Sequence, residues 1–252
     1  MHNPTFRVIS VLNLISTSKS GLTLAECSRS LHMPSGTLHP ILQTLYKNAY
    51  LNYDRYSCRY TVGFRLFFAG SNYVSNAPPY ENAQKVLKRI VNACGETAHW
   101  GVLEGADVLY FAKVDSKETV RMYSAVGKTL PAYATALGKA LLSRFSLEDL
   151  KVLYPGGLEA LTESTVTDIA KLYEQLQSVK KYGFAYEWEE SNKHICCIAV
   201  PVLIDGTVVS ALSVAVPVFR YTDEKKECIK ACLVRAADEA VKIVPYLNLS
   251  GN

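Results

Sequence analysis

The chain of 252 residues is long enough for two domains, the first small and the second large enough for a full core. No apolar run approaches the ~20 residues of a membrane span, and the N-terminus lacks the layout of a secretory signal, which excludes membrane and exported classes. Seven cysteines, an odd number, favour free thiols in a reducing cytoplasm. We expect a soluble, cytoplasmic protein.

Positive charge is concentrated at the start of the chain. Residues 1–70 contain seven Lys or Arg and two acidic residues, whereas residues 71–252 carry a net charge of −1. Basic charge gathered on a small module is typical of proteins that bind the phosphate backbone of nucleic acids. The first quarter of the chain is therefore the candidate nucleic-acid-binding region.

Two helices are predicted before residue 32. Apolar residues recur between Phe6 and Ile15 and form one wide stripe of a first helix. Thr23 and Glu26 have the spacing of a capping box at the start of a second helix, which ends at Leu31. The following Met33-Pro34 indicates a tight turn.

A third helix to Leu45 and two short strands within 50–62, around the polar turn 54–57, complete the module. This is the order of a winged helix-turn-helix, whose second motif helix enters a DNA major groove. An ordinary helical hairpin packed on a larger core is the alternative reading of the hairpin alone.

Pro40 affects where the third helix begins. A proline beyond the first turn of a helix removes a hydrogen bond, whereas at the third helical position no donor is missed. We therefore predict a regular helix that starts near Thr37, with Ser35-Gly36 as a bent or 3₁₀ approach. A regular α-helix from Ser35 through Lys47 would contradict this prediction.

Eight residues are candidates for DNA contacts. Those at the start of the third helix face base edges, and Gln43 lies one turn farther on, where a solvated surface glutamine is the alternative. Basic residues on the wing and at the end of the helix suit phosphates. The candidates are Ser35, Gly36, Thr37, His39, Gln43, Lys47, Arg55 and Arg59.

A helix is predicted over 64–74, and the segment 75–79 that follows it contains two prolines. We interpret the helix and this segment together as a stiff linker. The predicted organisation is thus a DNA-binding domain over 1–63, a linker helix over 64–79 and a second domain over 80–252. In the second domain we predict helices over 80–93, 135–143, 146–154, 167–181 and 222–244, and strands over 97–103, 108–114, 184–189, 195–203 and 207–216. Helices mixed with antiparallel hairpins predict an α+β domain with one sheet.

Short strings along nearly the whole chain resemble the IclR family of transcriptional regulators. They include Leu22-Thr-Leu-Ala-Glu26, Tyr60-Thr-Val-Gly63, Gly95-Glu-Thr97, Ala134-Thr-Ala-Leu-Gly-Lys-Ala-Leu-Leu142, Glu189-Glu190, Cys197-Ile-Ala-Val-Pro-Val202 and Ala211-Leu-Ser-Val214. The resemblance implies a winged helix-turn-helix domain, a linker helix and a GAF-like effector-binding domain. It further implies a dimer or dimer of dimers that binds palindromic operator DNA in bacteria. Many members carry arginine where this chain has Pro40.

The resemblance also implies which residues bind a small organic effector. Carried over by position, they are Thr135, Leu137, Gly138, Glu187, His194, Ile195, Cys197 and Ser213. A second serine of some relatives is Ala215 here. His194 stands where relatives have glycine, and either contacts the ligand or is exposed at the start of a strand.

Other chemistries compete with effector binding in the second domain. A redox sensor based on Cys196/Cys197 is one alternative, and an enzyme with a Cys–His pair from His99, His194 and Cys197 is another. Zinc is disfavoured because adjacent cysteines on a strand point to opposite faces. We therefore expect a ligand-responsive transcriptional repressor or activator, with no catalytic residue, metal, cofactor or membrane partner.

Overall fold

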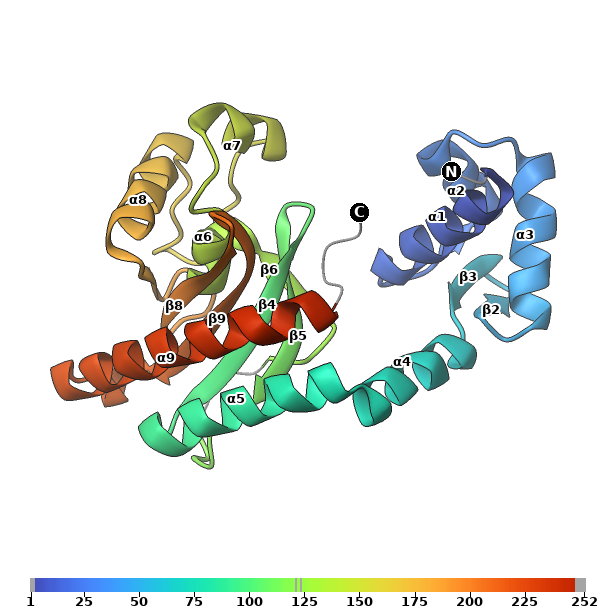
Figure 1. The fold of residues 1–252 in the computed structure, drawn as a ribbon. Helices are drawn as coiled ribbons and strands as arrows, with labels where there is room; N and C mark the ends of the chain where they lie inside the picture. Colours follow the sequence, from blue (N-terminus) through green and yellow to red (C-terminus); the bar gives the residue numbers. More distant parts are fainter. Residues whose placement is uncertain (1–2, 121, 123, 248–252) are drawn as a thin grey trace. The chain divides into compact units, whose positions relative to one another are not determined.

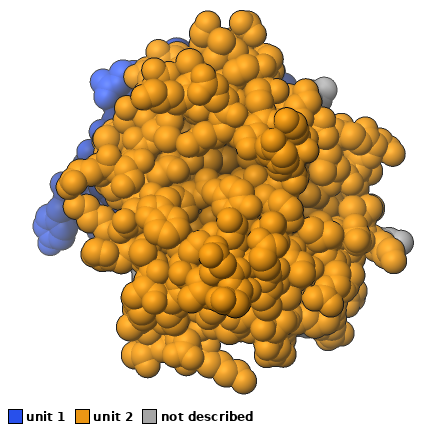
Figure 2. All heavy atoms as spheres, turned by 90° about the vertical axis from the view of Figure 1, so that its left-hand side faces the viewer, with its two compact units in different colours: residues 1–77 blue, residues 78–252 orange. Residues whose placement is uncertain are grey.

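A computed structural model describes residues 3–120, 122 and 124–247, and the chain divides into two compact units, residues 1–77 and 78–252 (Figures 1 and 2). Among these described residues, none of the helices has the length and apolar character needed to cross a membrane.

Unit 1 contains a three-helix core, a small sheet and a following helix (Figure 1). The antiparallel sheet has the strand order β1-β3-β2. The elements are α1 (Asn3–Thr17), β1 (Leu22–Thr23), α2 (Leu24–Leu31), α3 (Ser35–Lys47), β2 (Leu51–Asp54), β3 (Arg59–Val62) and α4 (Phe64–Asn76). The winged helix-turn-helix order predicted from the sequence is confirmed.

The predicted capping box forms at the start of α2. The Thr23 hydroxyl accepts a hydrogen bond from the Glu26 amide at 3.2 Å, and the Glu26 carboxylate accepts one from the Thr23 amide at 2.8 Å. The apolar residues of α1, α2 and α3 then meet Leu51 and Tyr60 of the hairpin in one core. The wing is therefore packed on the helices rather than free of them.

The predicted start of α3 near Thr37 is wrong. The α-helix begins at Ser35, and the Pro34 carbonyl accepts hydrogen bonds from the amides of both Thr37 and Leu38. Pro40 therefore lies within the helix and leaves the Gly36 carbonyl without its i+4 amide donor. Gly36 and Pro40 are both exposed, so water can solvate this carbonyl while the opposite face of the helix stays buried.

Unit 2 is built on a six-stranded sheet with the order β6-β5-β4-β9-β8-β7. Helices α5 and α9 pack side by side on one face, and α6 packs on the other (Figure 1). The helices are α5 (Pro78–Cys94), α6 (Ala136–Leu141), α7 (Leu147–Leu153), α8 (Ile169–Tyr182) and α9 (Asp223–Leu247), and two 3₁₀ turns are η1 (Ala132–Ala134) and η2 (Val218–Arg220). The strands are β4 (Thr97–Glu104), β5 (Asp107–Val114), β6 (Thr129–Pro131), β7 (Ala185–Trp188), β8 (Ile195–Ile204) and β9 (Thr207–Pro217).

Two details of unit 2 differ from the sequence-based expectation. Pro78 and Pro79 open α5 instead of preceding it, because the first turn of a helix needs no amide donors. The three-residue strand β6 was not predicted, and it pairs with β5 through Thr129, Leu130 and Pro131. A strand this short has no alternation from which to recognise it.

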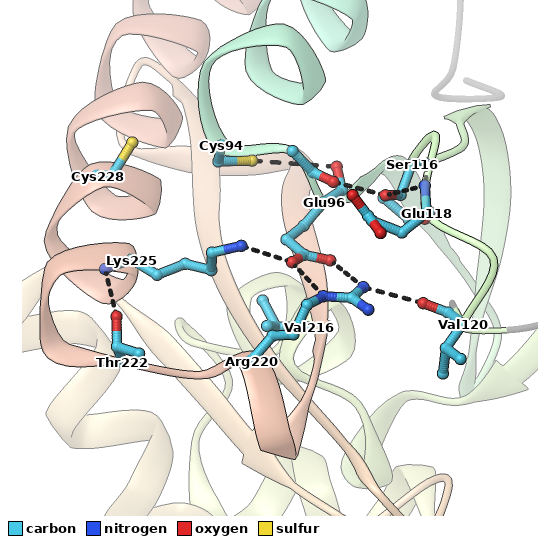
Figure 3. A network of polar contacts seen from close by, with 12 residues as sticks. Cys94, Glu96, Ser116, Glu118, Val120, Val216, Arg220, Thr222, Lys225 and Cys228 are labelled. Atoms are coloured by element: carbon cyan, nitrogen blue, oxygen red, sulfur yellow. Dashed lines mark hydrogen bonds and ion pairs between the residues drawn. The ribbon is translucent and has the colours of Figure 1, made fainter.

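A buried carboxylate ties four segments of unit 2 together. Glu96, 1% exposed, precedes β4 and accepts hydrogen bonds from Arg220 at 2.7 and 2.8 Å and from Lys225 at 2.7 Å. Arg220 also donates to the Val120 carbonyl at 2.9 Å, so it lies between the two acceptors (Figure 3). Burial alone would raise the pKa of Glu96, but Arg220 and Lys225 outweigh it and lower the pKa.

Candidate DNA-binding face and effector site

The N-terminal half of α3 presents polar groups beside the wing. Ser35 and His39 line a groove together with Gln43, and Gly36 is exposed next to them. The remaining lining comes from α2 and the hairpin, and consists of Thr23, Leu24, Ala25, Tyr53, Cys58 and Tyr60. Sequence reasoning missed Tyr53 and Cys58, because the strand pairing of the hairpin decides whether their side chains face α3.

Two of the predicted DNA contacts form side-chain hydrogen bonds within the domain. The Gln43 side-chain amide donates to the Tyr60 hydroxyl at 3.3 Å. Arg59 forms a two-pronged pair with the Glu26 carboxylate at 3.0 and 3.1 Å and donates to the Gly21 carbonyl at 2.7 Å. Arg59 thus ties the wing to the start of α2, while its side chain stays 32% exposed.

Lys47 and Arg55 remain exposed, at the end of α3 and at the tip of the wing. The Asp54 carboxylate shapes this tip by accepting hydrogen bonds from the Tyr56 amide at 2.9 Å and the Ser57 hydroxyl at 2.7 Å. Tyr56 is fully exposed. The wing tip therefore offers one cation and one aromatic ring on a fixed turn.

Four of the predicted effector residues share one face of the sheet in unit 2. Glu187 on β7 pairs with Cys197 on β8, and Cys197 pairs with Ala215 on β9. Ser213 lies two residues before Ala215 on β9, and Ile195 lies two residues before Cys197 on β8. Because side chains alternate along a strand, all of them point to the side of the sheet that α6 covers. The sheet register thus brings together residues far apart in the sequence.

Glu187 has one satisfied and one unsatisfied oxygen. Its Oε1 accepts hydrogen bonds from the amides of Glu190 at 2.7 Å and Ser191 at 3.0 Å. Its Oε2 is buried, and the Cys197 thiol is its neighbour, but it accepts no hydrogen bond from a nitrogen or oxygen donor among the described residues. Burial raises the pKa of this carboxyl, although the two amides oppose the effect. A buried polar atom without a partner is costly, and a ligand's polar group would supply the missing bond.

An ion pair joins α6 to the segment that follows β7, next to Glu187. Lys139, 1% exposed, donates to Glu190 Oε1 at 2.5 Å. The Glu190 carbonyl in turn accepts a hydrogen bond from the Thr165 hydroxyl at 2.7 Å. Burial lowers the pKa of Lys139 despite the carboxylate beside it. Sequence reasoning quoted Lys139 and Glu190 without pairing them, because 51 positions separate them.

The start of α6 is shaped by Thr135, its N-cap, and by Gly138 in its first turn. The Thr135 hydroxyl accepts a hydrogen bond from the Gly138 amide at 2.9 Å. A Cβ on Gly138 would lie 2.1 Å from the Ala132 carbonyl oxygen, so no larger residue fits. Leu137 packs against the sheet at Gly101, where an added Cβ would lie 2.5 Å from a Leu137 methyl. Thr135 and Gly138 thus shape the turn, while Leu137 forms a wall.

Comparisons with known proteins decide the family. Residues 71–242 match the family model for the bacterial transcriptional regulator IclR C-terminal domain, and residues 5–55 match the IclR helix-turn-helix domain. The chain belongs to the IclR family. The transcriptional regulator BhcR of Paracoccus denitrificans is 33% identical over 235 residues, which cover 92% of this chain and 84% of BhcR.

Solved structures support the same assignment. An IclR regulator from Alicyclobacillus acidocaldarius has a TM-score of 0.75 and 25% identity, covering 97% of this chain and 99% of its own. A regulator from Silicibacter with 20% identity has a TM-score of 0.80 over 96% of both chains and shares the fold. The IclR assignment, with a helix-turn-helix domain and a GAF-like α+β domain, is therefore confirmed, and the protein is an IclR-type transcriptional regulator.

His194 departs from the rest of the effector set. Its side chain is 87% exposed, beside the Glu189 carboxylate, which accepts a hydrogen bond from the His194 amide at 2.6 Å. The backbone φ of His194 is +66°, in the left-handed region that favours glycine. Of the two readings, the structure favours exposure at the strand's start, and His194 lines a surface groove with Met122, Ile195 and Phe219.

The alternatives to an IclR-type sensor gain no support from the geometry. Burial raises the pKa of Cys196 to about 12 and that of Cys197 well above its usual value, so both thiols are poor nucleophiles. The described residues contain no group of three metal-ligating side chains. The His99 ring, whose pKa burial lowers to about 3, bonds to the Ser124 hydroxyl at 2.8 Å.

Proposed function

We propose that this IclR-family regulator binds operator DNA through the start of α3 and the wing, and binds a small organic effector beneath α6 in unit 2. We further propose that it acts in the cytoplasm as a dimer or dimer of dimers. The observation that carries the effector site is the buried, unpartnered Oε2 of Glu187, which lies beside Cys197 on the covered face of the sheet.

The DNA-binding proposal rests on the exposed side chains of unit 1. Ser35, Thr37 and His39 are the candidates for base contacts, because they lie at the start of the helix that enters the groove. Lys47 and Arg55 are exposed cations suited to phosphates. Gln43 and Arg59 support this surface from within through Tyr60 and Glu26.

The effector proposal also draws on a structural relative. An IclR homologue from Microbacterium hydrocarbonoxydans, with 22% identity and a TM-score of 0.68, was solved in complex with 4-hydroxybenzoate. We infer only the class of ligand, a small organic molecule. Thr135, Leu137, Gly138, Ile195 and Ser213 frame its site, and His194 lies at the rim.

The DNA-binding part is tested by selection from random duplexes with the full chain, followed by fluorescence anisotropy. We expect a palindromic sequence to emerge and to bind at least about a thousandfold more tightly than unrelated DNA. Replacement of His39 by alanine should relax the preference at one base position. Equal affinity for all sequences would contradict the proposal.

The effector part is tested with a library of small metabolites. Thermal denaturation of the full chain identifies binders, since a bound ligand raises the apparent stability. A true effector should also change the affinity for the selected DNA, and Glu187→Gln should abolish this change because it alters the unpartnered oxygen. An unaltered response in Glu187→Gln would contradict the proposed site.

A further inference from the structure

One large side chain lies on the effector face that neither the family resemblance nor the proposed site includes. Tyr110 on β5 is 4% exposed and belongs to the same apolar core as Leu137, Ile195 and Cys197. It pairs with Gly101 on β4, so its side chain stands on the side of the sheet that α6 covers. Tyr110 therefore shares a compartment with the candidate effector residues.

The floor beneath this compartment is made of small side chains. Ala199 on β8 and Ala211, Ser213 and Ala215 on β9 all face α6, and Gly101 on β4 continues the row beyond Ala211. These residues leave a shallow strip across three strands. Leu137 of α6 covers Gly101, and a long side chain from a neighbouring strand, or a ligand, can fill the space above the other residues of the strip.

The Tyr110 ring lies against a side chain of the adjacent strand, β4. Its ring contacts the His99 ring at a centroid distance of 5.1 Å and an angle of 71°, which places it above the row of Ser213. Burial, and then the nearby Cys197 and Glu187, raise the pKa of its phenol. Tyr110 and Cys197 belong to the same core cluster, although β4 and β9 lie between their strands.

The His99 ring that packs against Tyr110 is itself fixed by hydrogen bonds. Besides its contact with Tyr110, His99 bonds to the Ser124 hydroxyl at 2.8 Å, and Lys113 donates to the Ser124 carbonyl at 2.6 Å. The imidazole is fully buried and its pKa is lowered to about 3, so it stays neutral. A ring packed against a fixed neighbour keeps a defined position.

We propose that the Tyr110 phenol fills the end of the effector site that the small side chains of β9 leave open, and so restricts the effector to a short polar molecule that fits between Glu187, Cys197 and the phenol oxygen. This inference rests on the effector site proposed above. It makes Tyr110 the residue that sets ligand size, and ring-sized acids are excluded from the native site.

The test removes the phenol and returns it as a free molecule. p-Cresol is the side chain that Tyr110→Ala deletes, and Tyr154→Ala is the matched control, because Tyr154 is a buried tyrosine of the same core whose hydroxyl donates to the Ala106 carbonyl instead. We expect p-cresol to raise the Tm of full-length Tyr110→Ala and to leave the native protein unchanged. Failure of p-cresol to stabilise Tyr110→Ala would overturn the proposal.

A second measurement separates an effector site from an ordinary core cavity. Saturating p-cresol should change the affinity of Tyr110→Ala for the selected DNA by at least about fivefold, the usual lower range of allosteric coupling. The DNA affinity of Tyr154→Ala should not respond. If p-cresol stabilises Tyr110→Ala but leaves its DNA affinity unchanged, Tyr110 is only a packing residue.

Tyr110→Leu guards against a variant that fails to fold, because leucine keeps apolar volume but is shorter. This variant should bind 4-hydroxybenzoate in a thermal-shift titration, whereas the native protein should not. Equal binding by both would contradict the size limit. By contrast, a native protein whose DNA affinity responds to no metabolite would contradict the proposed function itself.

Discussion

The polar side chains of the two units differ in how they are held. In unit 1 the candidate DNA contacts are exposed and mostly without partners, as at His39 and Arg55. In unit 2 several charged side chains are buried and paired, as at Glu96 and Lys139. Removing an exposed contact costs little stability, whereas removing one partner of a buried ion pair is strongly destabilising. The comparison predicts that DNA binding and stability respond to different substitutions.

The largest expected effect is on the stability of unit 2. Arg220→Ala leaves the buried Glu96 carboxylate with Lys225 alone and should lower the free energy of unfolding by about 3 kcal/mol, the lower end for a broken buried pair. Since the folded-state pKa of Glu96 is lowered, this stabilisation is present above its unfolded pKa and is lost as the pH falls through the folded value. Chemical denaturation at several pH values measures both.

Arg89→Ala is the matched control for this prediction. Arg89 pairs with Glu239 on the surface, where both side chains are about half exposed. Such pairs contribute about 0–1 kcal/mol. If the two variants lose similar amounts of unfolding free energy, burial does not explain the strength of the Glu96 pair.

The next effect comes from the first turn of α6. Gly138→Ala should destabilise unit 2 by about 2 kcal/mol, because the added methyl meets the Ala132 backbone, which cannot move aside as a side chain would. Gly156→Ala is the control, since nothing lies within 4 Å of its added Cβ. Thermal denaturation compares the two, and an equally stable Gly138→Ala would mean that the turn can shift.

Arg55 and Arg59 sharpen the comparison within unit 1. Arg55→Ala should weaken binding to every DNA sequence and reduce the slope of log K against log salt by about 0.9, the value for one lost phosphate contact. Arg59→Ala should lower the stability of unit 1, since it breaks the pair with Glu26, and leave the slope unchanged. Anisotropy titrations at four salt concentrations check this, and the opposite assignment would restore Arg59 as the phosphate ligand.

The smallest expected effect is at His194. His194→Gly should stabilise unit 2 by about 1 kcal/mol, because glycine adopts a φ of +66° without a Cβ penalty. His194→Ala keeps the Cβ and should bring no gain. If both variants lose stability equally, the contact with Glu189 outweighs the backbone strain.

Much of the fold could be predicted because the signals are local. The apolar runs over 195–203 and 207–216 and the capping box at Thr23 depend only on neighbouring residues, and the observed elements follow them closely. The start of α3 failed because the prediction weighed the hydrogen bond lost at Pro40 but not the exposure of the Gly36 carbonyl. What solvent reaches is not a local property of the sequence.

The site was only partly predictable for a related reason. The resemblance supplied Glu187, Cys197 and Ser213, and strand register explains why they meet. Tyr110 and the pairing of Lys139 with Glu190 depend on contacts across strands and helices. Neither alternation nor motif spacing carries that information.

The central claim is that unit 1 binds DNA and unit 2 senses the effector. The most direct test measures the affinity of two variants for the selected operator, with and without an effector from the library. Ser213→Ala should keep the native operator affinity and lose most of the effector response, because its hydroxyl lies on the effector face. Arg55→Ala should weaken operator binding and keep the fold-change caused by the effector. If Ser213→Ala instead loses operator binding and Arg55→Ala loses the response, sensing and DNA binding are not divided between the units as described.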